Sequence, residues 1–145
     1  MARRFDGGSL LLYNNALYGT TVYGGAGTNL GTVFKIGLDG TGYTVLHVFQ
    51  GICSGSDGSF PLSGLTLNPE DNMLYGITNN GGNSSDLGTV YKIDPNTGAE
   101  TIVHSFSGAD GANPEANLYI RKGKIYGSTS GGGANNVGVV FKLTP

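Results

Sequence analysis

Two histidines are the first candidates for chemistry in this chain. His47 and His104 are the only histidines, they stand 57 residues apart, and each precedes a phenylalanine by two positions. A histidine working with a tyrosine could supply the base and the acid of a lyase or a hydrolase. However, the two histidines occupy one repeated position, whereas catalysis needs unlike groups gathered at a single point. We therefore predict a packing or hydrogen-bonding role for both and no catalytic residue.

Two aspartates raise the possibility of a cation site. Asp57 and Asp110 each precede a glycine in equivalent loops, and calcium prefers carboxylate oxygens. One carboxylate per loop is too few for a tight site, and Asp86 is the only other acid in the same kind of loop. We therefore expect each aspartate to cap its own turn, with no metal and no cofactor. Cys53 stands alone, which excludes an intramolecular disulfide or a cysteine-based metal site.

Three lysines recur in step with the histidines. Lys35, Lys92 and Lys142 each follow an aromatic residue, and we expect their stems to lie along a sheet with the ammonium groups in water. A regular ring of cations is the alternative. The net charge of −2 argues against a nucleic-acid partner or an anionic membrane surface. No apolar run approaches about 18 residues, so we expect no membrane insertion.

All of these residues belong to an internal repeat, which four motifs define. A Leu-Tyr-Gly motif begins at Leu17 and recurs at Leu74 and, as Ile-Tyr-Gly, at Ile125. The other three are Gly-Thr-Val-Phe-Lys-Ile at 31–36, repeated at 88–93 and 138–143; His-x-Phe at 47–49, repeated at 104–106; and Asp-Gly-x-x-Pro at 57–61, repeated at 110–114. Their order and spacing hold over the whole chain.

The repeated motifs read as short β-strands separated by turns. The strands are β-branched and aromatic, and glycine makes up 27 of the 145 residues. No window has an apolar period long enough for a helix. We predict an all-β chain of four strands per unit, the arithmetic of a β-propeller blade; a β-solenoid and a β-sandwich are the alternatives. The single domain 1–145 then holds units at about 9–51, 65–108 and 118–143.

The last unit lacks its fourth strand, and residues 1–5 align with that strand. The twelve strands therefore follow the order 4-1234-1234-123. Because three blades cannot close a ring, we predict a homodimer of six blades, with a filament as the alternative if the contact does not close. A chain trimmed from a longer propeller is the other explanation. The predicted closure residues are Met1, Arg3 and Phe5 on one side and Val139, Phe141 and Leu143 on the other.

The long connections between strands gather at one end of such a fold. They are rich in glycine, asparagine, serine and aspartate, and their amides, hydroxyls and tyrosines could bind the hydroxyl groups of a sugar. The alternative is that tight turns simply require these residue types. The predicted ligand-binding residues are Tyr23, Asn29, Asp57, Asn83, Asp86, Asp110, Asn135 and Asn136.

The linked motifs resemble the GloVer-type tandem repeat, the Gloeobacter–Verrucomicrobia repeat, over nearly the whole chain. The resemblance implies a bacterial propeller-like protein that is exported or held at the cell surface, and it carries no catalytic residues. We expect no signal peptide within the sequence as given, because the apolar stretch at residues 10–13 is too short.

Taken together, these patterns favour a non-catalytic propeller module that assembles with itself and binds carbohydrate through repeated loop sites. A structural, surface or fibre-forming protein is the first alternative. An enzyme acting on polysaccharide is the second.

Overall fold

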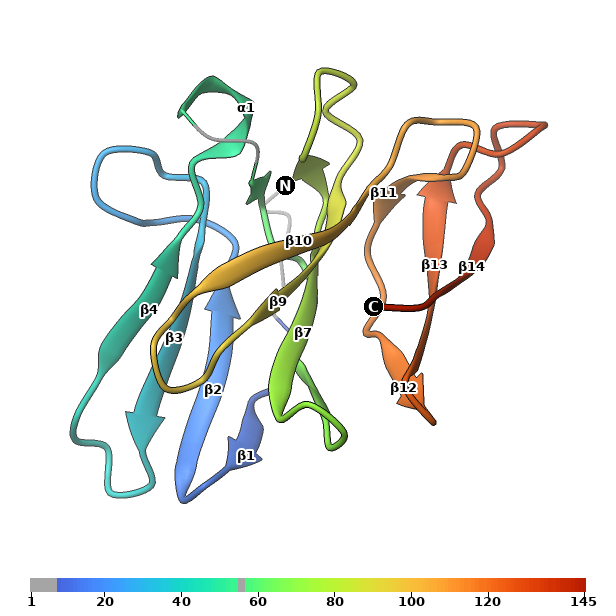
Figure 1. The fold of residues 1–145 in the computed structure, drawn as a ribbon. Helices are drawn as coiled ribbons and strands as arrows, with labels where there is room; N and C mark the ends of the chain where they lie inside the picture. Colours follow the sequence, from blue (N-terminus) through green and yellow to red (C-terminus); the bar gives the residue numbers. More distant parts are fainter. Residues whose placement is uncertain (1–7, 55–56) are drawn as a thin grey trace.

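The first sheet of the molecule is an antiparallel meander made by the first repeat unit. The computed structural model describes residues 8–54 and 57–145, and most of its elements are labelled in Figure 1. The sheet has the order β1-β2-β3-β4, with strands β1 (Leu11–Tyr13), β2 (Ala16–Thr21), β3 (Thr32–Gly37) and β4 (Thr44–Val48). The turn between β1 and β2 is Asn14-Asn15, both at positive φ, which is the backbone that a two-residue hairpin prefers.

The second sheet repeats this plan with the second unit. Its order is β10-β9-β7-β6, and its strands are β6 (Thr66–Asn68), β7 (Met73–Thr78), β9 (Thr89–Ile93) and β10 (Glu100–Ser105). Tyr75 pairs with Lys92 across β7 and β9, as Tyr18 pairs with Lys35 across β2 and β3. The register of the repeat is therefore kept from sheet to sheet.

The third sheet has the first three strands of the plan and lacks the fourth within the described residues. It contains β12 (Tyr119–Arg121), β13 (Lys124–Gly131) and β14 (Val140–Leu143), joined by the short linker strand β11 (Ala112–Pro114), which pairs with one end of β13. In the described part of the chain, β14 pairs with β13 alone. The equivalent strands β3 and β9 each have a second neighbour, β4 or β10.

The linkers between units bind each sheet to the next. After a single helical turn, α1 (Gly51–Ser54), the first linker forms β5 (Gly58–Ser59), which pairs with β8 (Asn80–Gly81) beyond the end of β7. The second linker forms β11 and pairs with β13 in the same way. Neither α1 nor these two-stranded pairings was expected, because segments of two to four residues carry no readable apolar period.

Two glycine positions fix the close packing within each unit. At Gly31, Gly88 and Gly138 the φ angle is positive, and an added Cβ would collide with a carbonyl oxygen of the preceding strand. Gly19, Gly76 and Gly127 leave a bare patch of backbone on which the aromatic ring of the next strand lies, Phe34, Tyr91 or Phe141. Only glycine fits these places.

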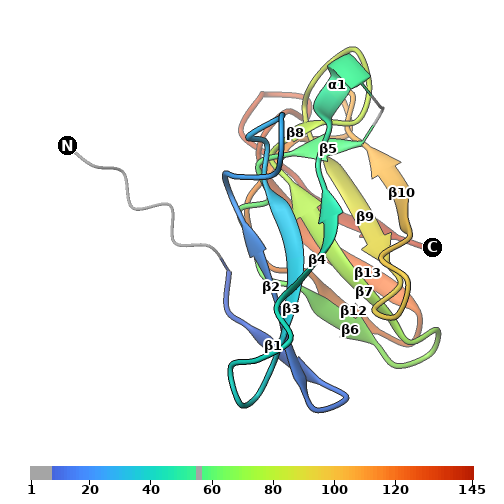
Figure 2. The same ribbon diagram turned by 90° about the vertical axis from the view of Figure 1, so that its left-hand side faces the viewer.

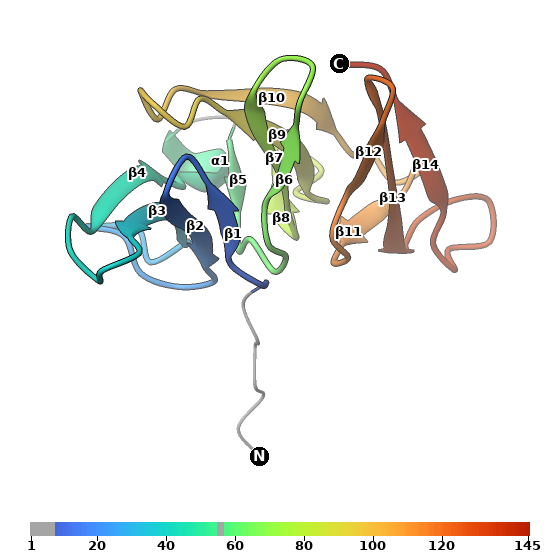
Figure 3. The ribbon, with the colours of Figure 1, turned by 90° about the horizontal axis from the view of Figure 1, so that it is seen from below.

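Two apolar cores lie between the three sheets, which stand side by side (Figure 3). The first core joins Tyr18, Val33 and Phe49 of the first sheet to the second sheet, and the second joins the second sheet to the third. The middle sheet is therefore apolar on both faces. The predicted all-β repeat architecture is confirmed at the level of three antiparallel sheets.

Candidate functional site

The two histidines anchor the loops that lead from one unit to the next. His47 Nε2 lies 2.9 Å from Asp57 Oδ2, and His104 Nε2 lies 2.8 Å from Asp110 Oδ2. The second carboxylate oxygen of each aspartate accepts a backbone N–H, from Gln50 or from Ser107, at 2.9 Å. Each aspartate thus ties a histidine to the backbone of a loop, the capping role that the sequence predicts.

The same histidines also contribute to the apolar cores. The His47 ring meets Phe49 edge to face with centroids 4.9 Å apart, and Phe49 in turn meets Tyr91 of the second sheet at 5.2 Å. His104 and Phe106 repeat this contact at 4.8 Å, and Phe106 meets Phe141 of the third sheet. The geometry is the same in both units, which fits the packing role predicted for the histidines.

The two anchors differ in how much water reaches them. The side chains of His47 and Asp57 are 19% and 12% exposed, whereas those of His104 and Asp110 are 29% and 40% exposed. Burial acts to raise the pKa of Asp110, but hydrogen bonds from Ser107 and His104 outweigh it and hold that pKa below its ordinary value. Asp110 is therefore ionised at neutral pH.

The predicted sugar-binding loops use much of their polarity internally. Asn29, Asp86 and Asn136 hold one repeated position at positive φ. The side-chain oxygen of each accepts a backbone N–H five or four residues earlier, from Gly24, Gly81 or Gly132. These three side chains shape the loops in which they lie.

The remaining predicted ligand residues lie in the same loops with mixed surroundings. Asn83 accepts the Ser85 N–H and donates to the Phe106 carbonyl, at 2.8 and 3.2 Å. Tyr23 is half exposed and meets Phe60 edge to face at 5.7 Å. Asn135 is exposed. The structure places the eight predicted residues along separate loops and does not gather them into one pocket.

The outer face of the first sheet carries exposed apolar side chains. Figure 2, viewed from that side, shows no other described sheet in front of it. Its residues are equivalent to those that the second sheet buries against the first. Leu10 is 52% exposed, whereas its counterparts Leu65 and Leu118 are 6% and 5% exposed. We call this surface the leading face, and it consists of Leu10, Leu12, Leu17, Phe34, Ile36, Tyr43 and Val45.

The outer face of the third sheet is also exposed, and it carries the counterparts of residues that the first and second sheets bury against the next sheet. Val140 is 86% exposed, although Val33 and Val90 at the same repeat position are fully buried. Tyr119 is 61% exposed, and its ring lies 6.3 Å from that of Tyr126 on the neighbouring strand. We call this surface the trailing face, and it consists of Tyr119, Tyr126, Ser128 and Val140.

The predicted closure residues are distributed between the inside of the molecule and its edge. Phe141 and Leu143 lie on β14 but pack inward against the second sheet. Val139 precedes β14, and its N–H donates to Thr129 Oγ1. Met1, Arg3 and Phe5 lie outside the described residues. That three blades leave two open faces follows from the repeat count. Sequence reasoning missed which residues form these faces, because neither Leu10 nor Val140 is among the predicted closure residues.

Metal and membrane sites receive no support from the residues described. Among 8–54 and 57–145, no group of three or more His, Cys, Asp or Glu residues is arranged to hold a metal ion. Within the same ranges, no helix has the length and apolar character needed to cross a bilayer.

The chain is similar to known proteins in two comparisons. The sequence model of the Gloeobacter/Verrucomicrobia repeat matches residues 4–145. Among solved structures, a chain of the "Crystal structure of Nidogen/Laminin Complex" superposes with a TM-score of 0.53 and 13% sequence identity, over 90% of this chain and 43% of that chain. That likeness concerns the fold alone, and this chain spans less than half of the longer one. No curated protein gives a significant match.

Proposed function

The chain belongs to the Gloeobacter/Verrucomicrobia repeat family, and from this premise we propose that it is a self-assembling β-propeller module whose ring is completed by a second copy of the chain. Each of the three sheets is a blade, the third to be completed by a strand of the partner, and two copies supply six. The observation that supports this proposal is the pair of open faces. Val140 is 86% exposed where its two repeat counterparts are fully buried.

The two faces complement each other as the inner sheets do. Inside the molecule, Tyr18 and Val33 of one sheet pack against Leu74, Tyr91 and Ile93 of the next. The trailing face carries the repeat counterparts of Tyr18 and Val33. The leading face carries the repeat counterparts of Leu74, Tyr91 and Ile93. A trailing face of one copy can therefore meet the leading face of another, in a head-to-tail contact that closes into a ring or continues as a filament.

The energy available from such a contact is substantial. Fully burying one Val, Leu, Ile or Phe side chain gains about 1.5–3 kcal/mol, and both faces carry exposed side chains of this kind. Within the described ranges one edge of β14 has no paired strand, and this edge adds backbone hydrogen-bonding capacity, because an open strand edge is a template for another strand. In this proposal residues 1–5, which lie outside the described residues, supply the fourth strand of the partner's last blade.

Sedimentation equilibrium tests the proposal directly. We expect a particle of twice the chain mass of 14.9 kDa. Val140→Glu disables the trailing face and Leu12→Glu disables the leading face, so each variant alone should remain monomeric. An equimolar mixture of the two should form a heterodimer through the one intact contact.

A matched control and a truncation sharpen this test. Ile52→Glu changes an exposed apolar residue of α1 outside both faces and should leave the mass unchanged. Removal of residues 1–5 should weaken the dimer if strand addition contributes. A stable monomer at all concentrations overturns the proposal, and filaments in place of dimers replace the closed ring with the fibre-forming alternative.

Sugar recognition at the loop-rich end stays a separate prediction. It depends on side chains such as Asn135, which is exposed, because Asn29, Asp86 and Asn136 hold their own loops. A glycan array tests it, with Asn135→Ala as the variant that should lose binding. Turnover of polysaccharide that disappears in a His47 or His104 variant would instead support the enzyme alternative.

A further inference from the structure

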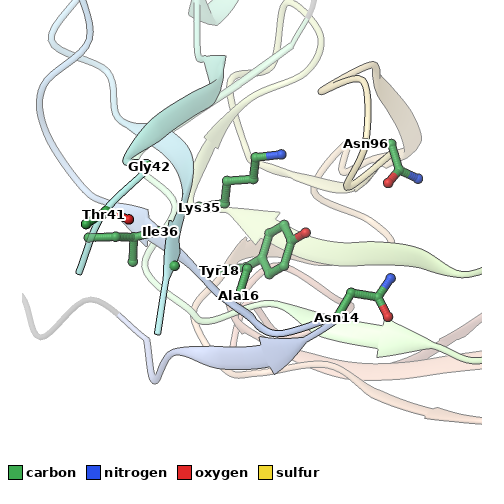
Figure 4. Close-up of a pocket in the computed structure, with 9 residues that line it drawn as sticks. Asn14, Ala16, Tyr18, Lys35, Ile36, Thr41, Gly42 and Asn96 are labelled. Atoms are coloured by element: carbon green, nitrogen blue, oxygen red, sulfur yellow. The ribbon is translucent and has the colours of Figure 1, made fainter. Parts of the chain in front are cut away.

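A polar pocket lies at the opposite end of the molecule from the long loops, between the first sheet and the β9–β10 turn of the second. We call it the corner pocket. It has a volume of about 400 Å³, and Figure 4 shows the side chains that line it. Thr41 is engaged by Asp39, and four other polar side chains also line the pocket. They are Asn14, Tyr18, Lys35 and Asn96, from the β1–β2 turn, β2, β3 and the β9–β10 turn.

In the second unit, a carboxylate occupies the position equivalent to the corner pocket. There, Tyr75 donates its hydroxyl hydrogen to Asp71 Oδ2 at 2.7 Å, and Lys92 Nζ lies 3.9 Å from the same oxygen. Burial, reinforced by the hydrogen bond to Asp71, raises the pKa of Tyr75 to about 12. One carboxylate thus satisfies the tyrosine hydroxyl and the lysine ammonium together.

The first unit has the tyrosine and the lysine but not the carboxylate. Tyr18 and Lys35 are register partners, as Tyr75 and Lys92 are. Counting back from the tyrosine, Asn14 stands at the position of Asp71. In the described part of the chain, neither the Tyr18 hydroxyl nor the Lys35 ammonium has a hydrogen-bonding or ionic partner. The corner pocket therefore has the tyrosine and the lysine that contact Asp71 in the second unit, but it has no carboxylate at the position of Asp71.

The acids nearest in sequence to the pocket lining are engaged within their own turns. Asp39 Oδ1 accepts both the N–H and the hydroxyl of Thr41, and Asp94 Oδ1 accepts the N–H of Asn96. These local bonds hold both carboxylates in the turns that flank the pocket. Lys35 is left as a cation that a carboxylate from outside can approach.

We propose that the corner pocket binds the carboxylate of a uronic acid, with Lys35 and Tyr18 on the carboxylate and the amides of Asn14 and Asn96 on the ring hydroxyls. A carboxylate is the group that the second unit places against the same pair. Amides both donate and accept hydrogen bonds, as sugar hydroxyls do. The inference is independent of self-assembly, because the pocket is built within one chain and its polar side chains belong to neither open face, although Ile36 of the leading face also lines it.

Titration with glucuronate, followed by the side-chain amide signals of Asn14 and Asn96 in NMR spectra, tests the site. Both pairs of signals should shift with a common saturation curve. Glucose, which lacks the carboxylate, should bind at least about tenfold more weakly. If acetate saturates the same signals at the same concentration as glucuronate, the pocket recognises charge alone and the sugar assignment is overturned.

Two variants separate the site from the fold. Lys35→Gln should weaken glucuronate binding by about tenfold or more, because it removes the charge-assisted contact. Asn14→Asp should also abolish binding, because it restores the internal carboxylate of the second unit, and it should raise the melting temperature instead of lowering it. Lys92→Gln, outside the pocket, is the matched control and should bind normally. Unchanged binding in both pocket variants overturns the proposal, whatever the oligomeric state.

Discussion

The middle sheet and the first sheet contain nearly the same residues in very different surroundings. Tyr91 and Ile93 are fully buried on the face that the middle sheet turns to the first. Their counterparts Phe34 and Ile36, on the leading face of the first sheet, are only half-buried. The order of the strands and the register of the central pair, β2 with β3 and β7 with β9, are the same in both. Burial in this protein is therefore decided by which neighbour is present, and the residue type alone does not decide it.

The comparison shows that a repeat unit is not a self-sufficient domain. A four-stranded sheet with two apolar faces needs a neighbour on each side. Among the described residues, only the middle sheet has both neighbours, and the first and third sheets each keep one face without one. The apolar side chains exposed on these two faces are repeat counterparts of those that stabilise the interior.

The largest expected effect on stability comes from removing the aromatic side chain of Tyr91, which the middle sheet buries against the first. Tyr91→Ala should lower the free energy of unfolding by about 3–5 kcal/mol, because it empties a fully buried position. Phe34→Ala should cost less than half as much in dilute protein, where the leading face meets water. Urea denaturation at a concentration below that of self-association measures both. Equal losses would contradict the role assigned to the neighbouring sheet.

The stability cost of the same two variants should depend differently on protein concentration. If the leading face is an assembly surface, the cost of Phe34→Ala should grow as the protein is concentrated, because binding of a partner stabilises the folded state by mass action. The cost of Tyr91→Ala should stay constant. A Phe34→Ala cost that is independent of concentration would argue against contact through that face.

A smaller effect is expected at the two loop anchors. Asp57→Ala should cost about 2 kcal/mol and Asp110→Ala about 1 kcal/mol, since each removes a charged hydrogen-bond acceptor and the Asp57 side chain is the more buried of the two. Thermal unfolding at neutral pH measures the difference. The reverse order would show that exposure does not govern the strength of these anchors.

The Asp110 anchor has a predictable dependence on pH. Because its pKa is lowered in the folded protein, its contribution is fully present above the ordinary range of an aspartate, near about 4. The contribution is lost as the pH falls through the lowered value. The gap in stability between the native chain and Asp110→Ala should therefore close in acid.

The smallest effect concerns Glu100, which stands where the first unit has the exposed Tyr43. Burial of Glu100, with a further contribution from Asp57, raises its pKa from 4.5 to about 7, although His47 opposes the shift. The charged form is thus disfavoured by folding, and stability should fall as the pH rises from 4.5 to 7. Glu100→Gln should remove this slope and stabilise the protein at pH 8 by about 1 kcal/mol, after allowance for solvent screening.

Denaturation curves between pH 4 and pH 8 test that prediction. Tyr43→Gln provides the matched control at the repeat-equivalent but exposed position, and it should leave the pH dependence unchanged. A native chain whose stability does not decline above pH 5 would show that the Glu100 carboxyl is well solvated.

The repeat made much of the fold predictable. The motifs at 31–36 and 88–93 became β3 and β9, and the four strands of the second unit lie within its predicted bounds, 65–108. Short elements such as α1, β5 and β8 were not predictable, because their pairing depends on partners far away in the sequence. The caps at Asp57 and Asp110 followed from turn chemistry, which is local.

The corner pocket was harder to find from the sequence for a physical reason. Asn14 belongs to a two-residue turn, whereas Asp71 belongs to the longer turn at 69–72. Their equivalence becomes clear only when the strands are counted back from Tyr18 and Tyr75. The exposure of Val140 was similarly hidden, because an identical valine at positions 33 and 90 is fully buried.

The linker strands have a mechanical consequence. Each linker leaves one sheet and pairs with the next, β5 with β8 and β11 with β13. A force that pulls the two chain ends apart must strip these short pairings before it can separate one sheet from its neighbour. We therefore expect the molecule to unfold under tension in discrete steps, one sheet at a time, with the strand pairings of the linkers resisting the force.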